Sequence, residues 1–125
     1  MDKATLVGVD VDAGAKIIKA LDDTQLKVNV AMWVVSPDYD DWRLVLASSA
    51  LDQNQPLKAY EKVTQVLQNN HIHMRPPILI LPMRDTFIGD LRKNFGKTGH
   101  VDGMRLGGQS FGNRFISDAY VYRIR

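Results

Sequence analysis

Residues 26–49, LKVNVAMWVVSPDYDDWRLVLASS, decide the fold. Side chains alternate along the first part, which predicts a strand over residues 26–35 with one well-buried face. Residues 42–49 alternate in the same way and predict a second strand. The segment between them, residues 36–41, is rich in turn formers. Because this connection is short, we expect the two strands to form an antiparallel hairpin.

Apolar residues at helical spacing predict three helices, at about residues 12–22, 56–69 and 86–95. A short apolar run, residues 6–9, precedes the first helix and suggests a strand or an extended arm. Residues suited to begin or end these helices stand at the expected positions: Asp10 or Asp12, Pro56, Asp85 and Gly96. The helices therefore alternate with the predicted strands along the chain.

The remaining extended segments complete a sheet. Residues 78–81 form a short apolar run between prolines and predict a buried strand. Gly112-Asn113 predicts the tight turn of a last hairpin, with glycine first as a type II′ turn prefers. The strand over residues 115–124 has apolar residues on both sides, which indicates a central or doubly covered strand. We predict one α+β domain, residues 1–125, with a mostly antiparallel sheet of about five strands and about three helices packed on one face.

The last predicted strand also bears on assembly. If it lies at an edge of the sheet, two copies of the chain could pair there as a symmetric homodimer. Arg123 and Arg125 stand at the end of this strand and could equally be the charges that block such pairing.

Composition narrows the class of protein. A chain of 125 residues with 45% apolar and 24% charged residues is an ordinary single domain. It has no cysteine, which excludes disulfides, thiolate zinc sites and cysteine nucleophiles. No apolar run is long enough to span a membrane, and the first residues lack the apolar core of a secretory signal. We therefore expect a cytoplasmic protein with no membrane partner.

Two short patterns resemble nucleotide or nuclease motifs. Gly96-Lys97-Thr98 lacks the earlier glycine of a phosphate-binding loop, because position 91 is leucine. Residues 6–12, LVGVDVD, resemble the first phosphate motif of actin-like ATPases and RNase H-like nucleases. A nuclease of that kind would need Asp10 and Asp12, with further carboxylates, to hold two metal ions. Neither motif is complete, so the sequence calls for no cofactor and leaves catalysis as an alternative.

The three histidines fall in two short pairs. His71 and His73 are two residues apart, as are His100 and Asp102. On strands each pair would point two ligands the same way, and together they could bind zinc or iron. They lie beside predicted helix ends, which favours solvated loop residues. A metal-dependent hydrolase or nuclease is therefore an alternative function.

Charge is divided unevenly along the chain. Residues 1–83 carry a net charge of −2, whereas residues 84–125 carry +4 and seven of the nine glycines. The candidate ligand-binding residues of this basic third are Arg92, Lys93, Lys97, Arg105 and Arg114. Phe111 and either Tyr120 or Tyr122 could add aromatic faces, on which the bases of a single-stranded nucleic acid would stack.

No complete catalytic set accompanies this charge. We therefore predict a small non-catalytic binding or protein-interaction module whose contact face is the basic third. Its partner would be an acidic protein surface or a small anionic ligand. A nucleic-acid-binding protein is a further alternative, because six phosphate contacts, from these five residues and Arg84, would make binding steeply dependent on salt.

Overall fold

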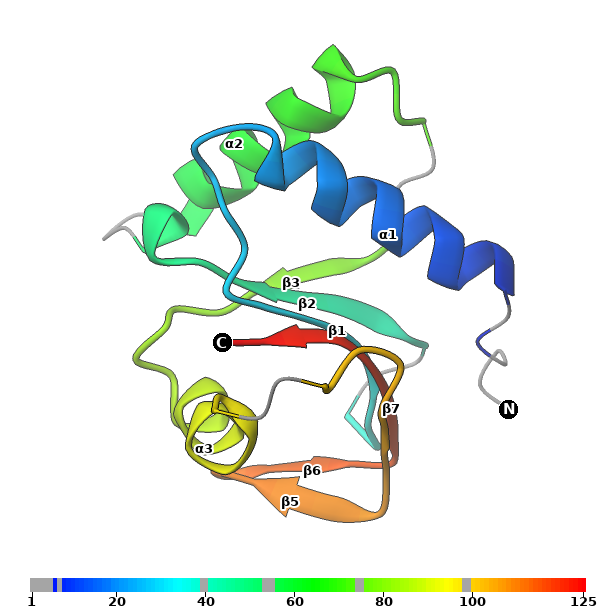
Figure 1. Ribbon diagram of the computed structural model, residues 1–125, viewed down its shortest axis with the longest axis vertical. Helices are drawn as coiled ribbons and strands as arrows, with labels where there is room; N and C mark the ends of the chain where they lie inside the picture. Colours follow the sequence, from blue (N-terminus) through cyan, green and yellow to red (C-terminus); the bar gives the residue numbers. More distant parts are fainter. Residues whose placement is uncertain (1–5, 7, 39–40, 53–55, 74–75, 98–99) are drawn as a thin grey trace.

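The computed structural model describes residues 6, 8–38, 41–52, 56–73, 76–97 and 100–125 (Figure 1). Its helices are α1 (Gly8–Asp22), α2 (Pro56–Asn69) and α3 (Thr86–Phe95), with a short 3₁₀ helix at Ser49–Leu51. Its strands are β1 (Val30–Val35), β2 (Arg43–Ala47), β3 (Ile78–Ile80), β4 (Arg105–Leu106), β5 (Gln109–Phe111), β6 (Arg114–Ile116) and β7 (Asp118–Ile124). No helix among the described residues is long and apolar enough to cross a membrane.

Five strands form the main sheet, in the order β3-β2-β1-β7-β4, and β5 pairs with β6 in a small second sheet. The predicted hairpin of β1 and β2 is present and antiparallel. The α+β class is confirmed, but the sheet is mixed, because β3 runs parallel to β2. α2 lies between β2 and β3 in the sequence, and a crossover through a helix allows the second strand to run in the same direction as the first.

Helices cover both faces of the sheet, which corrects the expectation that they pack on one face. Figure 1 shows α1 and α2 on one side, and α3 with the β5–β6 hairpin on the other. Every residue of β1 is buried, so both of its faces need cover. Trp33 belongs to the core beneath α1 and α2, whereas Met32 belongs to the core that includes Leu91 of α3.

The predicted last strand is divided in two. β6 ends at Ile116 and pairs with β5, and β7 begins at Asp118 and joins the main sheet. The turn at Gly112 has φ of 59°, as the glycine signal predicts. Because β7 lies between β1 and β4, it is an interior strand, so the argument for a homodimer through its edge is wrong.

The predicted strand or arm at residues 6–9 is also corrected, since α1 already begins at Gly8; Val7 lies outside the described residues. The phosphate motif that residues 6–12 resemble needs a strand there, and these residues are largely helical. Asp10 stands in the first turn of α1 rather than before it. A carboxylate in the first turn is still favourable, because the N-terminus of a helix carries partial positive charge.

A close contact between α1 and β7 fixes the layer above the sheet. The Tyr122 hydroxyl accepts a hydrogen bond from Trp33 Nε1 at 2.9 Å and donates one to the Val11 carbonyl at 2.6 Å. Gly14 faces this hydroxyl, and a Cβ there would lie 3.0 Å from Trp33 Nε1 and closer to the Tyr122 oxygen. Burial raises the pKa of Tyr122 to about 12, although the hydrogen bond from Trp33 opposes the rise.

Candidate functional site

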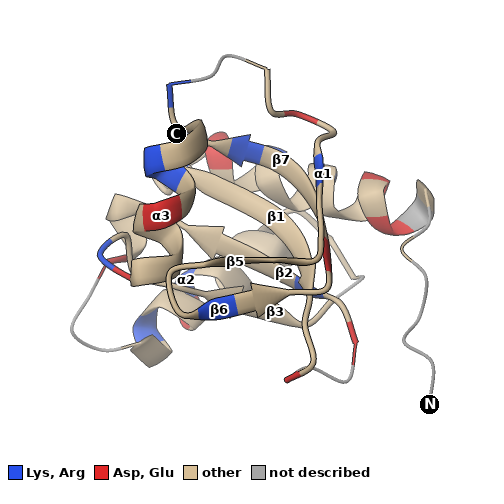
Figure 2. Cartoon of the chain, turned by 90° about the horizontal axis from the view of Figure 1, so that it is seen from below, with Lys and Arg blue, Asp and Glu red and all other residues tan. Residues whose placement is uncertain are grey.

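Three of the five predicted basic residues lie together at the end of α3. Arg92 and Lys93 are exposed in its last turn, and Lys97 is exposed just beyond it. The end of β7 adds Arg125, whose carbonyl oxygen accepts a hydrogen bond from Arg92 Nε at 2.8 Å. Figure 2 shows these basic positions gathered where α3 ends beside the end of β7. We call Arg92, Lys93, Lys97 and Arg125 the basic end.

An open hollow lies at the basic end. The residues that line it include three cations and two other side chains: Lys97, Arg123, Arg125, Asp102 and Tyr122. Sequence reasoning did not include Arg123 and Arg125 among the candidate ligand residues. Their contribution to the charge of the last third was visible, but their place at this hollow depends on the path of β7, which pairs with β1 and β4.

Ion pairing separates the basic end from Lys19, Arg105 and Arg123. Three ion pairs join residues that the structure describes: Lys19–Asp23, Arg105–Asp118 and Arg123–Asp22. None of them involves a residue of the basic end. Arg92 and Lys93 also stabilise α3, because cations near a helix C-terminus offset the partial negative charge of that end. Much of their charge nevertheless faces solvent and is available to an anion.

Arg105 lies away from the basic end. It stands on β4, forms an ion pair with Asp118, and places its guanidinium carbon 5.9 Å from the centre of the Trp42 ring. These two contacts use its charge to hold β4, β7 and the segment before β2 together. The structure therefore does not bring Arg105 to the other predicted cations.

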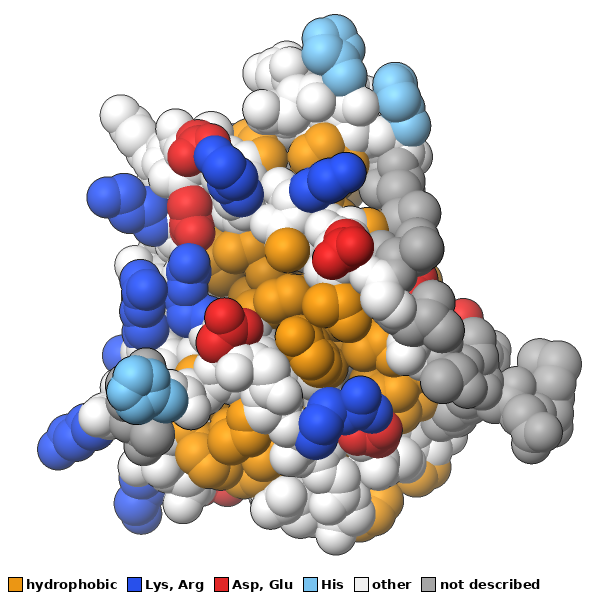
Figure 3. Space-filling view, turned by 45° about the vertical axis from the view of Figure 1, so that its right-hand side comes forward, with side chains coloured by type: hydrophobic (Ala, Val, Ile, Leu, Met, Phe, Trp, Pro, Cys, Tyr) orange, Lys and Arg blue, Asp and Glu red, His pale blue; other side chains and the backbone are white. Residues whose placement is uncertain are grey.

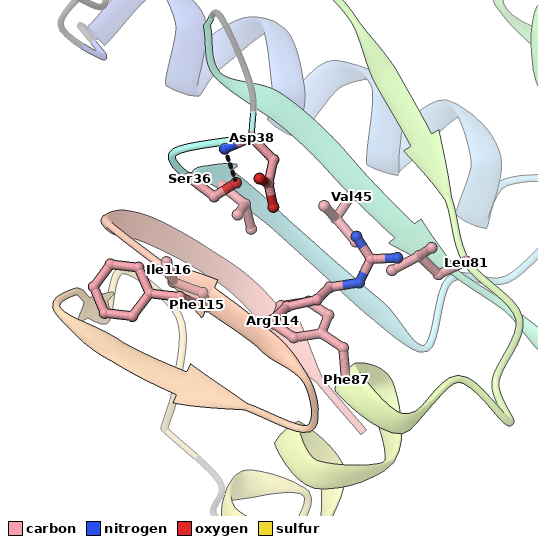
Figure 4. Close-up of a pocket in the computed structure, with 9 residues that line it drawn as sticks. Ser36, Asp38, Val45, Leu81, Phe87, Arg114, Phe115 and Ile116 are labelled. Carbon is pink, nitrogen blue, oxygen red and sulfur yellow. Dashed lines mark hydrogen bonds between the residues drawn. The ribbon is translucent and has the colours of Figure 1, made fainter.

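Arg114 also lies apart, on β6, at a small pocket between the hairpin and the sheet (Figure 4). Its guanidinium and the Asp38 carboxylate both extend into the space between the hairpin and the sheet, and apolar side chains such as Leu81 and Phe87 also line the pocket. The pocket holds about 20 Å³, which suits a single water rather than a ligand. We therefore place Arg114 outside the candidate site.

The histidine pairs do not form a metal centre. His71 has φ of 56° and ends α2, where the Ile72 N–H donates to the Leu67 carbonyl and the His71 N–H to the Gln68 carbonyl. This pattern is a helix C-cap, for which glycine is usual. His73, His100 and Asp102 are exposed. Within the described residues, which include Asp10 and Asp12, no three His, Cys, Asp or Glu side chains are placed to hold a metal ion.

The predicted aromatic faces are only partly available. Phe111 is buried, with its ring centre 6.4 Å from that of Phe87 and 5.9 Å from that of Phe95. Tyr120 and Tyr122 are half-buried, edge to face, with ring centres 5.3 Å apart. Phe111 therefore offers no stacking platform, while Tyr122 lines the hollow at the basic end.

Comparison with known proteins adds no relative. No family model matches the chain, and the searches of curated proteins and of solved structures found no match. The fold defines an α+β domain with a mixed five-stranded sheet, and the candidate site defines a cation-rich surface on it.

Proposed function

We propose that this protein is a non-catalytic binding module that holds an anionic partner at the basic end. One observation carries the proposal. Four cations gather where α3 and β7 end, and none forms an ion pair with a described carboxylate. Arginine and lysine recognise carboxylates and phosphates by charge and by hydrogen bonds, without a reactive group.

The exposure of these side chains sets the expected strength of binding. Each charge pair in water contributes about 1 kcal/mol at 4 Å, so several contacts are needed for a stable complex. Salt screens exposed charges over about 8 Å at physiological ionic strength. We therefore expect weak to moderate affinity that falls steeply as salt is added.

Charge reversal tests the proposal. The double variant Lys93→Glu/Lys97→Glu reverses two exposed charges four residues apart at the basic end. Lys58→Glu/Lys62→Glu is the matched control, because these lysines are also exposed and four residues apart, but lie on α2. Binding of a labelled oligoglutamate peptide at low salt is measured by fluorescence anisotropy.

We expect the first variant to lose at least tenfold in affinity and the control to change by less than threefold, although net charge is altered equally in both. Thermal melting of both variants shows that they remain folded. Equal losses in the two variants would mean that only net charge matters, and unchanged binding in the first would remove the basic end from the site.

A further inference from the structure

A second hollow adjoins the basic end, between α1 and β7. It is lined by Ala15, Ile18 and Lys19 of α1 and by Tyr122 and Arg123 of β7. Asp102, Tyr122 and Arg123 line both hollows, so the two adjoin, and we call them together the groove. Figure 3 shows apolar side chains gathered in the middle of a face of the molecule, with Lys and Arg side chains along its left side.

The apolar part of this groove follows from how the sheet is covered. Tyr120 and Tyr122 pack against the core beneath α1 and α2 but remain half-buried. Ala15 is exposed on α1 beside them, where its small side chain leaves the groove open. An exposed apolar patch with a polar rim is typical of a protein-interaction site.

Charges in the two halves of the groove differ. In the half beside α1, Lys19 pairs with Asp23 at 3.1 Å and Arg123 pairs with Asp22 at 2.8 Å. Among the charged residues that line this half, only Asp102 is outside these two pairs, so the lining carries a net charge of −1. The basic end, in the other half, has no such pairing among the described residues. A complementary partner is therefore apolar at one end and acidic at the other.

We infer that the groove binds a peptide segment of a partner protein in which apolar side chains are joined to a run of acidic ones. The apolar side chains lie over Ala15 and Tyr122, and the acidic ones meet the basic end. This inference rests on the proposed function and adds the class of partner. Both hydrogen bonds of the Tyr122 hydroxyl fix the ring, and a rigid aromatic surface loses little entropy on binding.

The test compares two labelled peptides of equal length. The mixed peptide has alternating leucine and serine in its first half and glutamate in its second, while the acidic peptide replaces each leucine with glutamine. Ala15→Gln fills the apolar half of the groove without changing charge. Ala50→Gln is the matched control, because Ala50 is exposed in the 3₁₀ helix and lines neither hollow.

We expect the mixed peptide to bind the unaltered protein about tenfold more tightly than the acidic peptide. Ala15→Gln should remove this advantage and leave the affinity for the acidic peptide unchanged, whereas Ala50→Gln should preserve both affinities. Lys93→Glu/Lys97→Glu should lower the affinity for both peptides.

Three results would overturn the inference. Equal affinity for the two peptides, or an advantage that survives Ala15→Gln, would refute the apolar subsite and leave the proposed anion binding intact. Tighter binding of a labelled single-stranded oligonucleotide than of either peptide would assign a different class of partner. Absence of binding by both peptides at low salt would refute the proposed function together with the inference.

Discussion

Replacing Gly14 with alanine tests the close approach of α1 to the sheet. In an exposed helix the change from glycine to alanine adds about 1 kcal/mol of stability. At Gly14 the new Cβ would lie 3.0 Å from both Trp33 Nε1 and Tyr122 Cζ, and closer to the Tyr122 oxygen. The Tyr122 ring cannot move aside without losing its hydrogen bonds to Trp33 and Val11.

The expected cost follows from these terms. Two hydrogen bonds contribute about 1 kcal/mol each, and overpacking costs about 1–3 kcal/mol. After the helical gain of about 1 kcal/mol is subtracted, Gly14→Ala should lower the free energy of unfolding by about 2–4 kcal/mol. Urea denaturation followed by tryptophan fluorescence measures this change.

Two further variants make the test specific. Gly89→Ala is the control, because Gly89 lies in α3 with nothing within 4 Å of an added Cβ, so it should raise stability. Tyr122→Phe removes the oxygen that the new methyl group meets. It should therefore cost less in the Gly14→Ala background than in the unaltered protein. If Gly14→Ala stabilises the protein as Gly89→Ala does, α1 does not approach β7 as closely as these distances require.

Three more outcomes are expected. Gly112→Ala should lower the free energy of unfolding by about 2–4 kcal/mol in urea denaturation, since φ is 59° and a Cβ would meet the Thr86 backbone at 2.7 Å. Gly108 has φ of 64° but open space around it, so Gly108→Ala should cost only the backbone part of about 1–2 kcal/mol. Equal losses of stability in the two variants would contradict the close approach to Thr86. His71→Gly should raise the melting temperature, because glycine removes the left-handed backbone cost of about 1 kcal/mol, and a fall would contradict the C-cap. Because the pKa of Tyr122 rises from 10.0 to about 12 on folding, the unfolded chain loses this proton first, so stability should fall between those pH values. Denaturation across that range should show a smaller fall for Tyr122→Phe, and equal falls would refute the assignment.

Local signals predicted the elements well. α2 spans Pro56–Asn69 as its spacing predicts, and the Asp85 carboxylate caps α3 by accepting from the Phe87 N–H at 2.9 Å. The face that α3 covers could not be predicted, because burial on both sides of a strand does not show which helix lies on which side. The break at Ser117 was missed for a similar reason. Apolar residues continue past it, and the Ser117 N–H donates to the Val35 carbonyl only in the folded topology.

In the candidate site, too, residues close together in the sequence were grouped correctly, whereas residues brought together by strand pairing were not. Arg92, Lys93 and Lys97 were predicted together, and they do lie together because they share one helix end. Arg105 and Arg114 were grouped with them by position in the chain alone, and separate strands carry them elsewhere. Arg125 joins the basic end through the path of β7, which depends on pairing with β1, about ninety residues away in the sequence.

The edges of the main sheet favour binding through side chains rather than through added strands. At the β3 edge, the Ile80 N–H already donates to the Tyr60 hydroxyl at 3.0 Å, and prolines 76, 77 and 82 flank the strand. Proline and occupied N–H groups both hinder the addition of another strand. At the opposite edge β4 has only two residues, so it offers a very short row of backbone groups. A partner is therefore better accommodated by the groove beside β7, where charge and apolar contact are both available.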